Sequence, residues 1–286
     1  MGGVLEQAWR TDEFGAAPRP EAIAALPLPP AKLKLLDHGV MRKQWRYVGI
    51  YGPEVMICAA VVTVGPATQT FWAIWDRETQ TLHDRTHNRN TAVKSPDGKL
   101  VIRDKGVSVE LDIEQVPGME VVTPTDSSWF WTRKQLGVRA QGTVKLGDRE
   151  IKVDSLGMID DSAGYHARQT LWRWSTGVGK DVQGRDVAWN FVNGMHDHAG
   201  ANENGIWVGD EVTAFPSAPI AEDLSAITIG ADTLNFHQES ERGAKSNLIL
   251  IRSEYRQPFG TFTGSLPGVG EIHDAFGVME FHDVVW

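Results

Sequence analysis

The chain has 286 residues with 28 basic and 37 acidic side chains, so its formal net charge is −9 at pH 7. A surface for nucleic acid or anionic membrane needs an excess or a block of positive charge, and the sequence has neither. The longest apolar run, residues 55–64, is about half as long as a membrane-spanning helix. The only cysteine, Cys58, cannot form an internal disulfide, and the amino-terminal residues lack the apolar stretch of a signal peptide. These features predict a cytoplasmic protein without nucleic-acid binding or membrane insertion, and a homodimer remains open.

Residues 1–39 predict an amino-terminal arm, because prolines at positions 18, 20, 27, 29 and 30 interrupt any regular element. Only residues 21–26, which are rich in alanine, have the composition for a turn or two of helix. From residue 44 onward, runs rich in Val, Ile, Thr and Trp alternate with hairpin signals, which lie at residues 95–98, 146–148 and 208–210.

Alternation of apolar and polar residues predicts strands in several segments, among them residues 70–75, 106–113, 138–153 and 248–255. No long segment keeps a helical period without a glycine or proline. The sequence therefore predicts an all-β fold of antiparallel barrels or sandwiches. Near residue 155 the density of Gly, Trp, His and Asn rises, so we expect two β domains at residues 40–158 and 159–286.

Residues 160–168 hold the first cluster of candidate catalytic groups. Asp160 and Asp161 are adjacent, and burial of either one would raise its pKa and make it a proton donor near neutral pH. On an extended chain His166 and Arg168 face the same side and would pair with one of these carboxylates. An acidic turn with a structural ion pair to Arg168 explains the same residues.

Residues 193–204 hold two further clusters. His196 and His198 have a spacing that metal sites use, with Glu203 as a third ligand, but the glycines around them favour a loop. We therefore expect no metal. Glu203, between two asparagines at the start of an apolar strand, is a candidate base or orienting group, and a simple turn is the alternative.

Tryptophan outnumbers tyrosine 11 to 4, and four tryptophans lie between residues 172 and 207. Trp172, Trp174, Trp189 and Trp207 line either one ligand cavity or a barrel core. On the last predicted strand, Glu280 and His282 share a face and would be unfavourable to bury without partners.

The segments GMIDDSAGYHARQTLWRW, WNFVNGMHDHAGANENGIWVG and GVMEFHDVVW resemble the bacterial family of domain of unknown function 2804 over about residues 40–286. More distantly, the chain is similar to the carotenoid hydratase and AttH-like group. That resemblance implies two lipocalin-like β-barrels packed together, a calycin architecture. It also implies an aspartic acid that protonates an alkene without a cofactor, here Asp160 or Asp161 with His166 and Arg168 as partners. Trp172, Trp174 and Trp207 would then face the carbocation.

The sequence thus favours a cofactor-independent hydratase, dehydratase or isomerase of a hydrophobic isoprenoid, steroid or aromatic compound. The alternative is a lipocalin-like carrier that catalyses nothing. The catalytic candidates are Asp161, Asp160, His166 and Glu203. The substrate-binding candidates are Tyr165, Arg168, Trp172, Trp174, Asn190, His196, Asn204, Trp207, Glu280 and His282.

Overall fold

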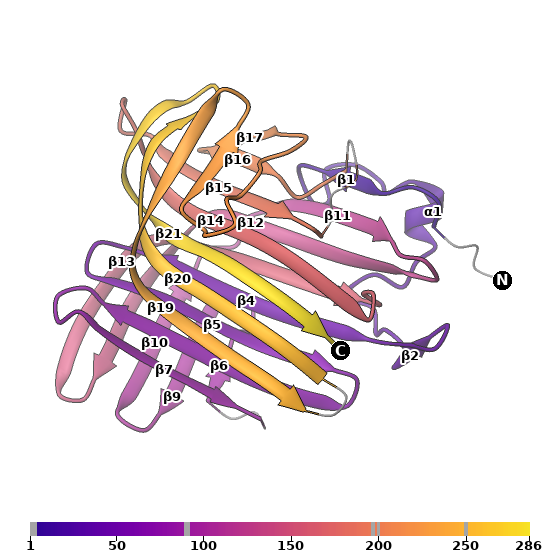
Figure 1. Cartoon of the computed structure of the whole chain (residues 1–286), viewed down its shortest axis with the longest axis horizontal. Helices are drawn as coiled ribbons and strands as arrows, with labels where there is room; N and C mark the ends of the chain where they lie inside the picture. Colours follow the sequence, from indigo (N-terminus) through magenta and orange to yellow (C-terminus); the bar gives the residue numbers. More distant parts are fainter. Residues whose placement is uncertain (1–4, 89–91, 196–197, 199–200, 249–250) are drawn as a thin grey trace.

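The computed structural model describes residues 5–88, 92–195, 198, 201–248 and 251–286, without the side chains of residues 246–251. Two large antiparallel sheets hold nearly all of the regular secondary structure in the described chain. Figure 1 shows the sheets curled and packed against each other, with the amino-terminal arm along one side. The predicted all-β fold of two packed lipocalin-like halves is confirmed.

The first sheet has 11 strands in the order β7-β6-β5-β4-β13-β12-β10-β9-β8, with β11 paired to β12 and β1 paired to β11. Its strands are β1 (Trp9–Thr11), β4 (Lys43–Tyr51), β5 (Val55–Val64), β6 (Ala67–Asp76), β7 (Thr81–His87), β8 (Val93–Lys94), β9 (Lys99–Asp104), β10 (Val107–Ile113), β11 (Met119–Pro124), β12 (Trp129–Leu146) and β13 (Arg149–Gly164). Residues from β6 and from β8, far apart in this order, share one apolar core, so the sheet curls around it.

The second sheet has 8 strands in the order β17-β16-β15-β14-β21-β20-β19-β18. Its strands are β14 (Gln169–Asp181), β15 (Asp186–Asn193), β16 (Gly205–Val208), β17 (Glu211–Ala214), β18 (Ala226–Ile229), β19 (Asp232–Leu248), β20 (Ile251–Leu266) and β21 (Gly270–Val285). It encloses a core of its own that includes Trp189, Phe191 and Phe262.

Two of the predicted hairpins form at the expected glycines. Gly147 joins β12 to β13 and Gly209 joins β16 to β17, with φ of 59° and 58°. A two-residue hairpin turn requires this left-handed conformation, which glycine adopts without a steric penalty. The turn residues therefore set the register of both hairpins.

A third apolar cluster lies between the two sheets and is rich in aromatic side chains. It combines residues of the first sheet, such as Tyr47 and Met158, with residues of the second, such as Trp174 and Phe259. In Figure 1, β19–β21 cross over β4–β7, and the pairs β4·β21 and β7·β19 are in contact. This inter-sheet layer carries the candidate site.

The arm packs over one end of the first sheet. It contains helix α1 (Glu21–Ala24), which is the short helix predicted, and the small hairpin β2 (Leu36–Asp37) and β3 (Val40–Met41). Ile23, Leu28 and Leu33 bury their side chains against Trp129 and Trp131 of β12.

The chain passes from the first sheet to the second between Gly164 and Gln169. The predicted boundary after residue 158 falls inside β13, which stays in the first sheet to its end. The division into two domains stays a prediction.

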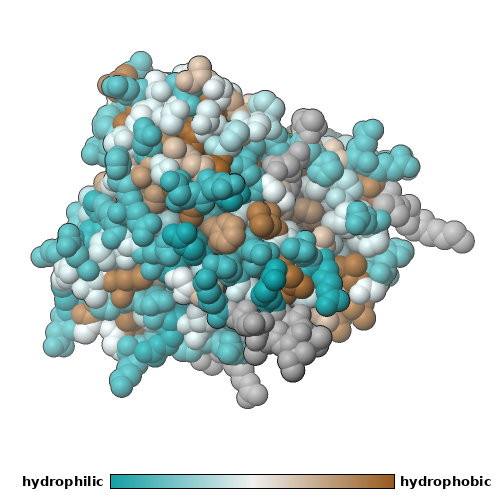
Figure 2. Space-filling model, in the orientation of Figure 1, coloured by the Kyte–Doolittle hydropathy of each residue, from teal (hydrophilic) through white to brown (hydrophobic). Residues whose placement is uncertain are grey.

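The face shown in Figure 2 is mainly hydrophilic, with apolar side chains in small separate patches. No helix in the described part of the chain has the length and apolar character needed to cross a bilayer. The cytoplasmic location and the oligomeric state stay predictions.

Candidate functional site

A buried lysine between two carboxylates is the centre of the candidate site. Lys134 on β12 and Asp160 on β13 are directly opposite in the strand register, so their side chains share one face of the sheet. The Lys134 Nζ lies 2.8 Å from Asp160 Oδ1 and 2.9 Å from Oε2 of Glu203, which precedes β16. All three side chains are buried. The triad therefore combines two residues of the first sheet with Glu203, which lies in the loop between β15 and β16 of the second sheet.

Asp160 has further partners from the first sheet. The indole Nε1 of Trp45 donates to Asp160 Oδ2 at 3.2 Å, and Thr132 Oγ1 donates to Oδ1 at 3.3 Å. The ammonium of Lys134 also lies 5.6 Å from the ring centroid of Trp174. The aspartate is thus held in one orientation, with an aromatic face nearby.

In this triad the single ammonium of Lys134 pairs with the carboxylates of both Asp160 and Glu203. Burial raises the pKa of Asp160, with the Lys134 charge opposing that effect and the Glu203 charge adding to it. Burial alone would lower the pKa of Lys134, but Asp160 and Glu203 outweigh it and raise that pKa. Lys134 therefore stays charged, and the second carboxylate gives the triad a net negative charge that favours proton uptake.

Glu280 on β21 is a third buried carboxyl group in the same layer. Trp172 Nε1 donates to its Oε1 at 2.7 Å, and Gln257 Nε2 donates to its Oε2 at 2.9 Å. Burial raises the pKa of Glu280 to about 7, and the charge of Asp160 adds to this shift. Near neutral pH, Glu280 therefore holds a proton about half of the time.

Hydrogen bonds fix the aromatic walls of the layer. Trp174 Nε1 donates to Asn190 Oδ1 at 2.8 Å, and Asn190 Nδ2 donates to the Glu203 backbone oxygen at 2.9 Å. The Tyr47 ring meets the Trp174 ring edge to face at 5.4 Å, and its hydroxyl lies 3.3 Å from that of Tyr51. Burial raises the pKa of both tyrosines, so both stay neutral.

The four tryptophans expected in one cavity divide between two places. Trp172, Trp174 and Trp207 belong to the inter-sheet layer. Trp189 belongs to the core inside the second sheet, where its ring meets Phe262 at 4.9 Å. The four tryptophans therefore belong to two apolar clusters, and a role of Trp172, Trp174 and Trp207 as walls of a ligand cavity stays a prediction.

The arm holds the segment that carries Glu203. Arg10 Nη1 donates to the backbone oxygens of Asn202 and Asn204, both at 2.8 Å. The Asn204 side chain accepts a hydrogen bond from the Val192 backbone at 2.8 Å. Arg10 and Lys134 were not anticipated from the sequence. A pattern in the sequence could have indicated that Lys134 is buried, because it lies on a strand at a position that shares a face with apolar residues.

Several predicted candidates lie outside the buried triad. Asp161 points to the other face of β13 and pairs with Arg46, at 2.6 Å from Nε. Tyr165 packs in the cluster under the arm, and its hydroxyl donates to the Lys34 backbone oxygen at 3.0 Å. Arg168 is exposed. The structure therefore corrects the expectation that Arg168 shares a face with buried His166, because β13 ends at Gly164 and the chain is no longer a strand there.

The predicted histidines have separate surroundings. The ring of His166 packs 4.8 Å from Trp45 and 4.4 Å from Phe130. His282 lies 4.4 Å from the Trp172 ring, and burial followed by the Arg242 charge lowers the pKa of His282 to about 3. His196 lies outside the described residues, and His198 is exposed. Within the described ranges no group of three or more His, Cys, Asp or Glu side chains is placed to hold a metal ion.

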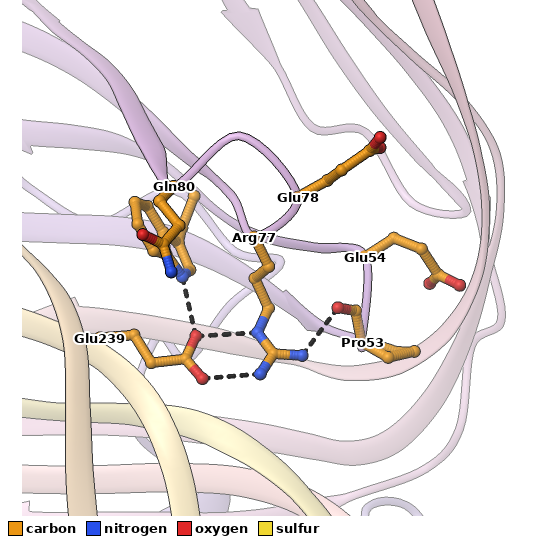
Figure 3. Close-up of a pocket in the computed structure, with 7 residues that line it drawn as sticks. Pro53, Glu54, Arg77, Glu78, Gln80 and Glu239 are labelled. Atoms are coloured by element: carbon orange, nitrogen blue, oxygen red, sulfur yellow. Dashed lines mark hydrogen bonds and ion pairs between the residues drawn. The ribbon is translucent and has the colours of Figure 1, made fainter.

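An open groove of about 680 Å³ lies at the edge where the two sheets meet, apart from the buried triad. Glu239 of β19 lines the groove, and Figure 3 shows its carboxylate facing Arg77, with hydrogen bonds accepted from Trp75 Nε1 at 2.8 Å and from Arg77 at 2.6 Å. Arg77 also donates to the Pro53 backbone oxygen at 2.7 Å. These paired charges join the first sheet to the second, so we assign the groove a structural role.

Comparisons with known proteins agree with the fold. The sequence profile of the family described as "Domain of unknown function (DUF2804)" matches residues 83–286. An AttH candidate from Nitrosomonas europaea is 11% identical, with a TM-score of 0.53 over 89% of this chain and 97% of that chain. Kievitone hydratase from Nectria haematococca is 10% identical, with a TM-score of 0.53 over 85% of this chain and 88% of that chain. A sequence search of curated proteins gives no match.

Proposed function

The chain belongs to the DUF2804 family, and we propose that it is a hydro-lyase that hydrates or dehydrates a hydrophobic small molecule by acid–base chemistry. The observation that carries this proposal is Glu280, a carboxyl group with a pKa of about 7 inside an aromatic layer. A group with this pKa gives and takes protons readily at neutral pH. The nearby Lys134 triad supplies a second carboxylate of different protonation.

In the hydration direction, protonated Glu280 gives its proton to one carbon of an alkene. The positive charge that develops on the other carbon is stabilised by the faces of Trp172 and Trp174. Asp160, paired with the Lys134 ammonium, takes a proton from the attacking water as the new carbon–oxygen bond forms. Dehydration reverses these steps. Isomerisation results when the carbocation, instead of taking up water, loses a proton from a different carbon to Glu280, so that the double bond forms at a new position.

Two acids on opposite sheets suit this division of roles. Glu280 belongs to the second sheet and Asp160 to the first, and the charge of Asp160 raises the pKa of Glu280. Tyr51 is close enough to both carboxylates for each to raise its pKa. Glu280 and Asp160 thus lie in one layer but have different hydrogen-bonding partners. Because of these different partners, we assign Glu280 as the proton donor and Asp160 as the proton acceptor.

The fold similarity to kievitone hydratase supports the proposal only as a precedent that a hydratase uses such a fold. We extend it to isoprenoid, steroid or aromatic alkenes because the layer between the sheets is apolar and aromatic. A second candidate is a lipocalin-like carrier, which the same apolar layer favours. A carrier has no need of three buried carboxyl groups in that layer.

The test is incubation of the protein with a panel of isoprenoid, steroid and aryl alkenes in water labelled with heavy oxygen. Mass spectrometry then detects an alcohol that contains the label. We expect one alkene class to be hydrated, and Glu280→Gln and Asp160→Asn each to abolish the labelled product. The carboxylate variant Glu254→Gln, on β20, is the control and should keep full turnover. Binding of an alkene without turnover would favour the carrier.

A further inference from the structure

Arg242 on β19 is a buried cation within the inter-sheet layer. Its side chain is only 4% exposed. The guanidinium contacts two aromatic rings, with its central carbon 4.1 Å from the centroid of Phe71 on β6 and 5.0 Å from that of Tyr255 on β20. Because Phe71 belongs to the first sheet and Tyr255 to the second, the guanidinium lies where the two sheets meet.

The charge of Arg242 is incompletely matched. Its Nη2 donates to Thr86 Oγ1 at 2.8 Å, whereas the carboxylate of Asp84 lies 4.0 Å from Nε, beyond hydrogen-bond distance. Within the described residues, Nε of Arg242 has no hydrogen-bond partner. A guanidinium is charged at every physiological pH, and the 4.0 Å ion pair with Asp84, whose side chain is 43% exposed, offsets only part of the unfavourable burial of that charge. This imbalance indicates that an anionic group binds here.

Two polar groups lie near Arg242, and one of them, the Tyr255 hydroxyl, interacts with the Glu280 carboxylate and lowers its pKa. The hydroxyl of Tyr255 and the Oε1 of Gln257 are buried and make no hydrogen bond of good geometry in the described part of the chain. Tyr255 nevertheless lies close enough to Glu280 to affect its pKa, and its ring centroid lies 5.2 Å from that of His282. His282 is neutral at pH 7, because its pKa is lowered to about 3. Arg242 is therefore the cation that faces Tyr255.

From this arrangement we propose that Arg242, assisted by the hydroxyl of Tyr255, binds the carboxylate of an otherwise hydrophobic substrate. The rings of Phe71 and Tyr255, which are tilted by 52° to each other, both pack against the guanidinium and restrict its position before the ligand arrives. Since Tyr255 contacts both Arg242 and Glu280, a carboxylate held at Arg242 places the hydrophobic part of the molecule near Glu280. The inference rests on the proposed function for the role of Glu280, but the anion site itself is independent of turnover.

The test compares two ligands that differ in one group, 2-naphthoate and 2-naphthalenemethanol, by isothermal titration calorimetry. We expect the wild-type protein to bind the carboxylate at least about tenfold more tightly than the alcohol, because a charge-assisted hydrogen bond contributes at least this much. Arg242→Gln should abolish the preference. Tyr255→Phe should weaken carboxylate binding several-fold and leave alcohol binding unchanged. Arg256→Gln, on β20 in an exposed pair with Glu241, is the matched control and should keep the preference.

Equal binding of the two ligands by the wild type, binding of neither, or a preference that survives in Arg242→Gln would each overturn the proposal. If Arg242→Gln does not fold, as judged by circular dichroism, Arg242→Lys keeps the charge and loses the planar donors. A carboxylate preference as strong in Arg242→Lys as in the wild type would contradict the role of the guanidinium. Carboxylate binding without any hydration would refute the hydro-lyase and leave the anion site in place.

Discussion

In the wild type, the free energy of unfolding should fall as the pH rises from 4.5 to about 7, and replacement of Glu280 by glutamine should remove this fall. The folded-state pKa of this group is raised from 4.5 to about 7, chiefly by burial. Between these values the unfolded chain releases the proton while the folded protein keeps it. Stability therefore falls as pH rises, and the fall ends above the folded pKa.

The magnitude follows from the shift of about 2.5 units, from 4.5 to about 7. At about 1.36 kcal/mol per unit, the free energy of unfolding decreases by about 3 kcal/mol across this range. Glutamine does not ionise, so the variant loses this contribution. It also fits the site, because the Oε1 of Gln257 has no partner within the described chain and a flipped Gln257 amide accepts from the new Nε2.

The assay is urea unfolding followed by tryptophan fluorescence, which the 11 tryptophans make sensitive. The quantity compared is the difference in free energy of unfolding between pH 5 and pH 8, in the wild type and in Glu280→Gln. We expect this difference to be smaller in the variant by about 2.5 kcal/mol, because part of the fall has already occurred at pH 5, and unchanged in the control Glu254→Gln. An equal pH dependence in wild type and Glu280→Gln would refute the reasoning, because Glu280 would then titrate alike in both states.

Three further changes test the triad and its support. Lys134→Met leaves two buried carboxylates without a cation and should lower the free energy of unfolding by about 3–5 kcal/mol, whereas adding Asp160→Asn should recover part of this loss in the same urea assay. Arg10→Ala should speed amide hydrogen exchange around Glu203, measured by mass spectrometry, because two hydrogen bonds to that segment are lost; unchanged exchange would exclude a supporting role. Asp161→Asn should keep the hydration activity that Asp160→Asn loses, and equal loss in both would contradict the assignment of Asp160 as the base.

Features that depend on neighbouring residues were predictable from the sequence. The alternation in residues 107–113 predicted a strand, and Val107, Val109, Leu111 and Ile113 are indeed buried while the residues between them are not fully buried. Hairpins form at Gly147 and Gly209 because the turn conformation is local. The sequence does not show that Asp160, Glu203 and Glu280 are buried. It nevertheless indicates each of them as a candidate site residue, because each is an ionisable group close to apolar segments.

The relation between Asp160 and Asp161 shows where reasoning from spacing failed. The sequence presented the two as alternatives for one role, either in a turn or in a buried site. They lie within β13, so their side chains point to opposite faces, and only Asp160 faces Lys134. Knowing that the strand continues to Gly164 would have separated them. The end of a strand depends on pairing with β4 and β12, which a local pattern does not report.

Lys134, Arg10 and Arg242 were missed for a common physical reason. Each is a single basic residue whose role depends on a partner far away in the sequence. Lys134 pairs with Glu203, Arg10 donates to Asn204, and Arg242 packs on Phe71. Burial of a charge is possible only where tertiary structure supplies counter-charges, hydrogen bonds or aromatic faces. Such cations become visible only when the sheets are packed.

The packing of the two sheets therefore decides the chemistry in this fold. Glu280 and Gln257 come from the second sheet, and Asp160 and Lys134 come from the first, so neither half alone contains both carboxyl groups. The desolvation that raises the pKa of Glu280 exists only while the first sheet covers it, because Tyr51 and Asp160 lie across the same layer. A change that separates the sheets without unfolding them should return Glu280 toward its ordinary pKa and remove the proposed proton donor.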